Sequence, residues 1–393
     1  MKALRNIFLK TKPYVQKGAK FHWLHSTFDA FFTLAFVPNN TSKSGSHIHD
    51  HIDLKRTMSF VIIALLPALL VGMYNTGYQH FKAIGMLAST GFFEVFTYGL
   101  IKVMPVVIVS YVSGLAIEFA FAQMRNHEVN EGFLVSGMLI PLVMPINTPL
   151  WMVAVATAFA VIFGKEVFGG TGMNIWNPAL LARAFLFFAY PVQMSGDKVW
   201  VSLGETDKVV DGFTGATIMG DAAAGNINFD VFHAFIGLIP GSIGETSALA
   251  ILIGGIFLIM TGIGSWKIML STVLGGVVMG VILNLAAGIS GLSPAVAAYF
   301  SMPFWHHLII GGFAFGAVFM ATDPVSAAQT ESGKWIYGFL IGVTAILFRV
   351  VNPAYPEGMM LAILLMNTFA PLIDHYVVEN NIKRRLKRAK VTA

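Results

Sequence analysis

Cysteine is absent from this chain of 393 residues. Its absence excludes disulfide bonds, cysteine-ligated iron–sulfur clusters and thioether-linked haem or flavin on the chain. Redox chemistry would therefore need a cofactor held by oxygen, by nitrogen or by packing. Two further signals are missing. A polar, basic segment follows Met1 where a secretory signal would be apolar. The glycines at 169–172 do not form the strand-to-helix loop of a dinucleotide site, so no NADH site is expected.

Charged residues are also scarce. They make up 11% of the chain against 56% hydrophobic residues, and the mean hydropathy is +0.71, whereas soluble domains carry roughly 25% charged residues. Because about 20 apolar residues cross a bilayer, the apolar runs predict an all-α polytopic membrane protein with about ten transmembrane helices. The candidate spans lie near 57–75, 100–123, 132–146, 149–165, 177–191, 246–263, 268–289, 306–321, 335–351 and 357–377.

Basic residues predict how the chain is oriented. Lys55 and Arg56 precede the first span and a basic cluster follows the last, so the positive-inside rule places both termini in the cytoplasm. The long loop between the fifth and sixth spans is acidic and is expected outside. The chain then divides into a basic and aromatic cytoplasmic segment (1–54), a first membrane half (55–191), an extracytoplasmic loop (192–245), a second membrane half (246–378) and a basic cytoplasmic tail (379–393).

The outer loop contains the most informative motif, which runs from Asp211 to Thr217 and reads D-x-x-T-G-A-T. Two small residues precede Thr217, so a bulky group could approach its hydroxyl. An ordinary Gly-Thr turn would explain the same residues. The motif resembles the recognition sequence of flavin transferases, in which the last threonine is esterified to the phosphate of FMN. The expected position outside the membrane agrees with this resemblance.

Carboxylates within or at the ends of spans form a second group of candidates. They are Glu118, Asp323 and Asp374. A charge at mid-bilayer costs a few kcal/mol or more, so each is a functional candidate. Carboxylate oxygens suit a hard cation such as sodium, and we expect a sodium pathway here. For Asp374, an interfacial position near Lys383 and Arg384 is the alternative.

Two segments read as broken helices, 169–178 and 320–326. Broken backbone at membrane depth requires protein or a polar ligand to satisfy its free groups. The amides of Asn174 and Asn177 could bind a neutral ring system such as an isoalloxazine, or could cap the fifth span. We also expect the glycine-rich turn at 240–246 to face the phosphate on Thr217.

Other features support weaker interpretations. The alternating His47, His49 and His51 read as a polar linker more readily than as a metal site. His306 and His307 lack a suitably spaced partner for haem. The segment 1–54 reads as a membrane-surface helix, or alternatively as a lip over a lipid-quinone pocket. A faint likeness between 131–134 and 245–248 indicates an inverted repeat.

The chain resembles the NqrB family, the B subunits of the bacterial sodium-translocating NADH:quinone oxidoreductases, over nearly its whole length. The RnfD proteins of the Rnf complexes are relatives with the same flavin motif, but the long basic N-terminal segment favours the quinone reductase. The resemblance rests on the flavin motif and on stretches at 53–56, 127–133, 165–172, 177–180, 239–245, 321–326 and 351–358.

The resemblance implies a role for each candidate residue. Thr217 would hold covalent FMN, with Asp211 in its motif, and Asn174 and Asn177 would bind riboflavin. Glu118, Asp323 and Asp374 would serve sodium uptake or translocation. Gly114 would lie in the quinone and inhibitor region, although Leu115 replaces a second glycine that the family can have.

The resemblance also implies an environment and partners. The chain would be a multi-pass protein of the bacterial inner membrane, in a complex with a second FMN-carrying subunit and an NADH-oxidising flavoprotein. It would pass electrons from FMN through riboflavin to a lipid quinone, with no nucleic acid involved. A passive ion or solute transporter and a membrane scaffold without cofactors are the alternatives of another class.

Overall fold

The structure is a computed structural model. It describes residues 2–15, 54–125, 132–204, 209–210, 213–227, 229–288, 294–352 and 357–391, with scattered positions between 19 and 45. The regular elements within these residues are all helical, so the predicted all-α class is confirmed. Asp211 and the histidines at 47, 49 and 51 lie outside the described residues.

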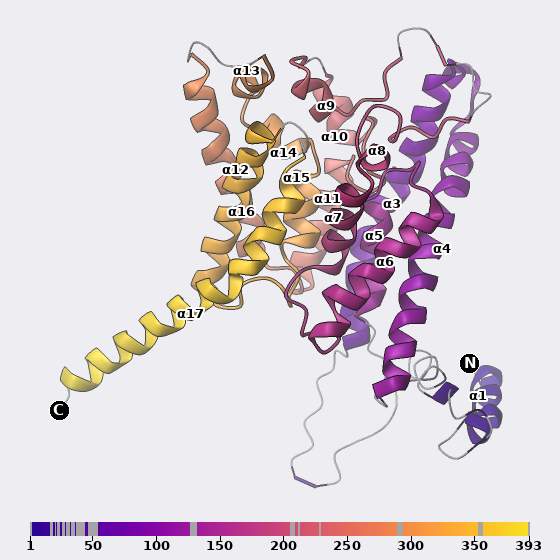
Figure 1. The fold of residues 1–393 in the computed structure, drawn as a ribbon, viewed down its shortest axis with the longest axis vertical. Helices are drawn as coiled ribbons and strands as arrows, with labels where there is room; N and C mark the ends of the chain where they lie inside the picture. Colours follow the sequence, from indigo (N-terminus) through magenta and orange to yellow (C-terminus); the bar gives the residue numbers. More distant parts are fainter. Residues whose placement is uncertain are drawn as a thin grey trace.

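Two sets of helices pack side by side in one bundle (Figure 1). The first comprises α3 (Leu54–Ala83), α4 (Phe92–Arg125), α5 (Phe133–Leu142), α6 (Leu150–Gly164) and α7 (Pro178–Ala189). The second comprises α11 (Ala248–Met260), α12 (Trp266–Ala286), α14 (His306–Ile309), α15 (Phe313–Phe315), the π-helical turn η4 (Gly316–Met320), α16 (Glu331–Val351) and α17 (Met359–Val391).

Shorter helices lie at the two ends of this bundle. In Figure 1, α9 (Ile218–Ala223), α10 (Val231–Ile236) and α13 (Pro294–Ser301) lie at the upper end, whereas α1 (Lys2–Val15) and the end of α17 lie at the lower end. The remaining short elements are η2 (Leu87–Ser89), η3 (Glu166–Phe168) and α8 (Pro191–Met194). The two ends of the chain and the loop with Thr217 are therefore at opposite ends of the molecule, as the basic residues predict.

Each of the ten expected spans has a helical counterpart in the described residues, but these helices differ in length and continuity. Six helices of the described chain are long and apolar enough to cross a membrane. The helices α5, α7 and α11 have only 10 to 13 residues. At about 1.5 Å per residue they are too short to cover about 30 Å of hydrocarbon. Both α3 and α4 extend beyond the expected ends at 75 and 100. The described chain thus has the helices of a multi-pass membrane protein.

The eighth expected span, 306–321, is broken and not continuous. Gly311 and Gly312 have φ angles of +63° and +67°, in the left-handed region that glycine tolerates. The freed carbonyls bond to a guanidinium: Arg349 donates to His307 O at 2.7 Å and to Ile310 O at 2.8 Å. A sequence that reads as one apolar run can break here because α16 supplies these donors.

Glycines allow the main helix pairs to touch along their backbones. A Cβ atom on Gly275 of α12 would lie 2.1 Å from Phe339 O, and one on Gly342 of α16 would lie 2.1 Å from Thr272 O. Without a hydrophobic effect between helices in lipid, such close van der Waals packing is what drives association. The α12–α16 pair is therefore held at a spacing that only glycine permits.

Polar side chains at the upper end of α3 anchor the long loop. Asn75 Nδ2 donates to Ile239 O at 2.8 Å, and the buried His80 ring lies 2.7 Å from Ser202 O. From the α5–α6 turn, Asn147 Nδ2 donates to Val201 O at 2.7 Å. These bonds hold both arms of the 192–245 segment against the bundle and so fix the position of Thr217.

The close contact of α12 and α16 at glycine predicts that a single added methyl group lowers the stability of the protein. Gly342→Ala should destabilise the protein by about 1–3 kcal/mol, because the new atom meets a backbone carbonyl that cannot rotate away. Gly288→Ala is the control, since its Cβ would meet nothing within 4 Å. Thermal or SDS-induced unfolding of the purified protein measures the difference. Equal midpoints for the two variants would contradict the packing.

Candidate functional site

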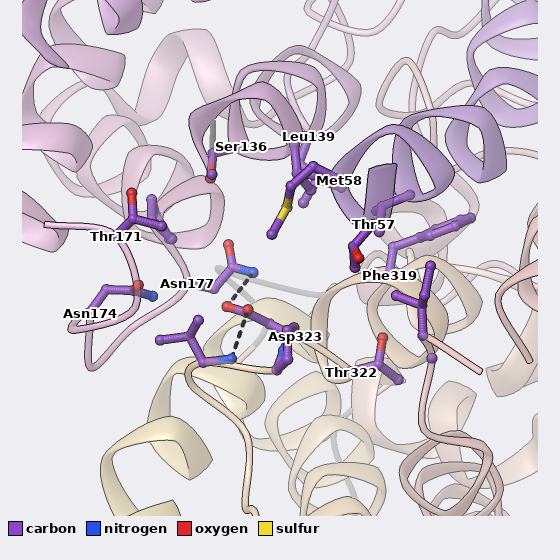
Figure 2. Close-up of a pocket in the computed structure, with 18 of the residues that line it drawn as sticks. Thr57, Met58, Ser136, Leu139, Thr171, Asn174, Asn177, Phe319, Thr322 and Asp323 are labelled. Carbon is purple, nitrogen blue, oxygen red and sulfur yellow. Dashed lines mark hydrogen bonds between the residues drawn. The ribbon is translucent and has the colours of Figure 1, made fainter. Parts of the chain in front are cut away.

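A central cavity of about 110 Å³ lies between the two sets of helices. Since roughly 10–15 Å³ suffices for one water molecule, it has room for a larger guest. Figure 2 shows Thr57 and Met58 of α3, Ser136 and Leu139 of α5, the 171–177 segment and Phe319, Thr322 and Asp323 around it. The cavity therefore brings together both segments that the sequence predicts as broken helices.

Asn177 and Asp323 meet in this cavity. Asn177 precedes Pro178 at the start of α7, and its Oδ1 accepts from Ala179 N at 2.9 Å. Its Nδ2 donates to Asp323 Oδ2 at 3.4 Å (Figure 2). Asp323 also accepts from Ser326 Oγ at 2.8 Å and from Val325 N at 3.2 Å. Asn177 thus caps a helix and reaches into the cavity at once, so the two interpretations of this residue do not exclude each other.

Asn174 lines the same cavity, but it lies in an irregular segment before α7. Gly169, Gly170 and Gly172 have φ angles of +119°, +100° and +88°, which turn the chain back toward the bundle. Asn174 Nδ2 then donates to Trp176 O at 3.1 Å. Its side chain remains at the cavity wall, where its amide can both donate and accept.

Glu118 is held by an ion pair. Its carboxylate bonds to the ammonium group of Lys165, and both side chains are about 5% exposed or less. Lys165 itself lines the central cavity. Beside it, Arg125 pairs with Glu166 at 3.0 Å. The charge of Glu118 is therefore compensated within the protein, and its sodium role stays a prediction.

Asp374 has a different environment. Its Oδ2 accepts from Gln329 N at 2.7 Å and its Oδ1 from Thr330 N at 3.0 Å, just before α16 begins. The cap of α16 is Thr330, whose Oγ1 accepts from Gly333 N and donates to Asp374. Asp374 therefore holds the capping residue in place, and its described contacts do not bring it to the central cavity.

Gly114 lies where α4 meets α5. A Cβ on Gly114 would stand 1.9 Å from the tip of the Phe133 ring, which is 1% exposed. The glycine therefore makes room for a buried aromatic ring. The structure shows this packing role, and the quinone role of Gly114 remains a prediction.

Thr217 lies between two further cavities at the other end of the bundle. It is half-buried, and its Oγ1 accepts from Gly220 N at 3.1 Å as the cap of α9. One cavity, of about 350 Å³, runs past Ala216, Thr217 and Gly220, and we call it the Thr217 cavity. The other, of about 30 Å³, contains Thr217 together with the 239–246 turn. The expected approach of that turn to Thr217 is thus observed.

The buried guanidinium of Arg183 lies in the wall of the Thr217 cavity. Arg183 donates to Ser242 Oγ at 2.8 Å, bonds to the carboxylate of Glu357 and lies 3.5 Å from Glu245 Oε1. It also donates to Val143 O at the end of α5. Arg183 therefore neutralises two carboxylates, Glu357 and Glu245, that lie just before α17 and α11.

The Thr217 cavity has the volume of a small ligand pocket. Its volume falls at the low end of the 300–1,000 Å³ or so that is usual for ligand pockets, and small residues leave the Thr217 hydroxyl accessible. Two aspartates in its wall, Asp197 and Asp221, oppose a phosphate charge, but burial raises the pKa of Asp221. Arg183 also lines this cavity, but its charge is already paired with Glu357.

Comparison with known proteins decides the family. The model of the NQR2, RnfD, RnfE family matches residues 41–383. The chain belongs to this family. It is 46% identical to a protein named as the B subunit of Na(+)-translocating NADH-quinone reductase from Pseudomonas aeruginosa (strain LESB58), over 98% of this chain and 99% of the relative. Proteins of the same name from Ectopseudomonas mendocina (strain ymp) and Pseudoalteromonas atlantica are 47% and 46% identical, over 98% and 96% of this chain. The resemblance inferred from the motifs is confirmed.

Three residues that form ion pairs at these cavities were not identified from the sequence. They are Lys165, Glu245 and Glu357, which lie in stretches that carry the resemblance but which we did not single out. The sequence does contain a signal that marks these residues as candidates. Each is a charged residue beside glycine or an apolar run, in a chain with few charges. Which of them pair with one another could not be read from their order in the chain.

The buried ion pair makes a quantitative prediction. Lys165→Met should destabilise the protein by about 3–5 kcal/mol, because it leaves the Glu118 carboxylate buried without its partner. The double variant Glu118→Met/Lys165→Met should recover most of that loss. Lys267→Met is the control, since its partner Glu331 is 66% exposed and such pairs contribute about 1 kcal/mol or less. Unfolding midpoints test all three, and a double variant as unstable as the single one would sink the pairing.

Proposed function

We propose that the chain is NqrB, the membrane-embedded B subunit of a sodium-translocating NADH:quinone oxidoreductase. The relatives that carry this name cover nearly the whole chain. The observation that carries the proposal is the place of Thr217: a flavin-transferase motif ends at a hydroxyl beside a cavity of about 350 Å³. In this proposal the chain works with other subunits, including a second FMN-carrying subunit and an NADH-oxidising flavoprotein, and reduces a lipid quinone.

Two other functions are less well supported. RnfD proteins belong to the same family model, but the curated relatives described above are quinone reductase subunits. A passive transporter would explain the broken helices and buried carboxylates equally well. It gives no reason for a half-buried threonine hydroxyl to stand at the junction of two cavities.

In our proposal, Thr217 Oγ1 would carry FMN through a phosphoester. The small side chains of Ala216, Gly220 and Ala223 leave space beside that oxygen, and the Arg183–Glu357 pair closes the cavity on the protein side. The flavin supplies the electron chemistry, and the protein contributes position and electrostatic tuning. Asp211 belongs to the motif that the transferase would recognise.

Riboflavin would bind in the central cavity, in contact with Asn174 and Asn177. The amides of both residues offer donors and acceptors to a ring edge, while Leu139, Leu258 and Phe319 offer apolar walls. The α11 helix links the two sites: Thr246 precedes it at the Thr217 end and Ile263 follows it at the central cavity. Its 13 residues correspond to about 20 Å, which is the reason for two separate flavins.

Sodium would enter the same central cavity at Asp323. The Asp323 carboxylate and the Ser326 hydroxyl beside it offer the oxygen ligands that a hard cation prefers. Moving one charge against a potential of roughly 100 mV costs about 2.3 kcal/mol, which the redox reaction must supply. Glu118 and Asp374 would act along the path before or after this cavity, and Gly114 would shape the quinone region.

The flavin attachment has a direct test. Purified protein, expressed with a flavin transferase and denatured in SDS, should give a fluorescent band that disappears in Thr217→Ala. Ser195→Ala is the matched control and should keep the band, since this hydroxyl lines the same cavity but lies outside the motif. Thr217→Ser keeps a hydroxyl at the same position and should retain part of the signal. A dark band from the unmodified protein would overturn the assignment and favour the transporter.

A second test separates the two aspartates. In the assembled complex, Asp323→Asn should raise the KM for sodium by roughly tenfold or more, equivalent to about 1.4 kcal/mol of lost ion binding. Asp374→Asn should instead lower stability by about 1–3 kcal/mol, because an amide has one acceptor oxygen where the carboxylate accepts at both of its oxygens. Sodium titrations of quinone reduction and thermal unfolding measure the two effects. An unchanged sodium KM in Asp323→Asn would contradict a sodium site at this residue.

A further inference from the structure

The last part of α17 leaves the bundle. The helix runs from Met359 to Val391, and its end projects obliquely from the lower side of the molecule (Figure 1). Asp374 fixes the point of departure, because it accepts from two backbone N–H groups just before α16. We call residues 375–391 the α17 tail. At about 1.5 Å per residue, it extends roughly 25 Å beyond Asp374.

The surrounding residues place this point of departure at a membrane–water interface. Trp266 is the first residue of α12 and Trp335 lies near the start of α16. Their ring centroids are 5.9 Å apart. Lys267 lies over the Trp266 ring and also pairs with Glu331. Tryptophan next to lysine at helix ends is typical of the boundary between lipid tails and water. Asp374 bonds to the residues just before α16, so the α17 tail starts at this level.

The α17 tail has the surface of an interfacial helix. Val378, Ile382 and Leu386 are 46%, 52% and 58% exposed. They follow one another at intervals of four, so they fall within about 80° of arc and form a single apolar stripe. The remaining surface is basic, with Lys383, Arg384, Arg385, Lys387 and Arg388 exposed and Glu379 as an acid, paired to Lys383 at 2.7 Å.

We propose that the α17 tail is a docking helix for anionic phospholipid. Val378, Ile382 and Leu386 enter the boundary between headgroups and acyl chains, and the arginine and lysine side chains bind the phosphates around them. Charge complementarity selects the partner, because a helix with a narrow apolar stripe and a basic remainder binds anionic lipid surfaces. The α17 tail leaves the bundle at the end where α1 also lies (Figure 1), so it faces the cytoplasmic leaflet of our topology.

The absence of cysteine makes the test simple. Leu386→Cys in the full-length protein carries a single nitroxide label on the apolar stripe, and Arg384→Cys carries one on the opposite face. Each protein is placed in nanodiscs of zwitterionic phosphatidylcholine, with or without anionic phosphatidylglycerol. Collision with oxygen reports lipid exposure, and collision with a water-soluble nickel chelate reports water exposure.

We expect the label at 386 to become several-fold less accessible to nickel when phosphatidylglycerol is present, whereas the label at 384 stays accessible. High salt should weaken this protection, since it screens charges at the surface. Replacing Arg384, Arg385 and Lys387 by glutamine in the Leu386→Cys protein should remove the dependence on anionic lipid. Two outcomes would overturn the proposal: nickel access at 386 in both lipids, as for a tail that stays in water, or equal protection in both.

Discussion

The buried Arg183 guanidinium is the contact on which the rest of the structure depends. It belongs to α7 of the first set of helices, but its carboxylate partners, Glu245 and Glu357, lie just before α11 and α17 of the second. In a hydrocarbon environment an uncompensated charge is expensive, so the two sets cannot separate here without exposing it. The same group lines the cavity beside Thr217. The position of this threonine is therefore tied to the contact that joins the two halves.

Unsatisfied backbone is the second constraint. A membrane helix can break only where other groups bond to its freed carbonyls and N–H groups. The break at Gly311–Gly312 is satisfied by Arg349, and the turn after Asp323 by the aspartate side chain itself. The break before Pro178 is satisfied in part by Asn177. Each break thus places a polar side chain inside the bundle, and these side chains line or support the cavities.

Much of this arrangement could be predicted from the order of residues alone. Hydropathy predicted the all-α class and the positions of the apolar helices, six of which in the described chain are long enough to cross a membrane. The broken segments at 169–178 and 320–326 were visible through glycine and Asx-Pro pairs. The break at 310–312 was not, since its compensating donor, Arg349, lies almost 40 residues further along the chain. For the same reason Lys165 could not be assigned to Glu118, nor Asp374 to the start of α16. Long-range pairing of charges leaves no local pattern.

The bond between Asn177 and Asp323 has a consequence for whatever enters the central cavity. A carboxylate oxygen has two lone pairs, and Asp323 Oδ2 already accepts from Ser326 and from Asn177. A guest that binds this oxygen must displace one of the two donors. Where Asn177 is the donor that yields, the guest disturbs the residue that caps α7, the helix that also carries Arg183. Occupancy of the cavity and the position of the Asn177 side chain are then linked, so that each shifts the other by the same free energy.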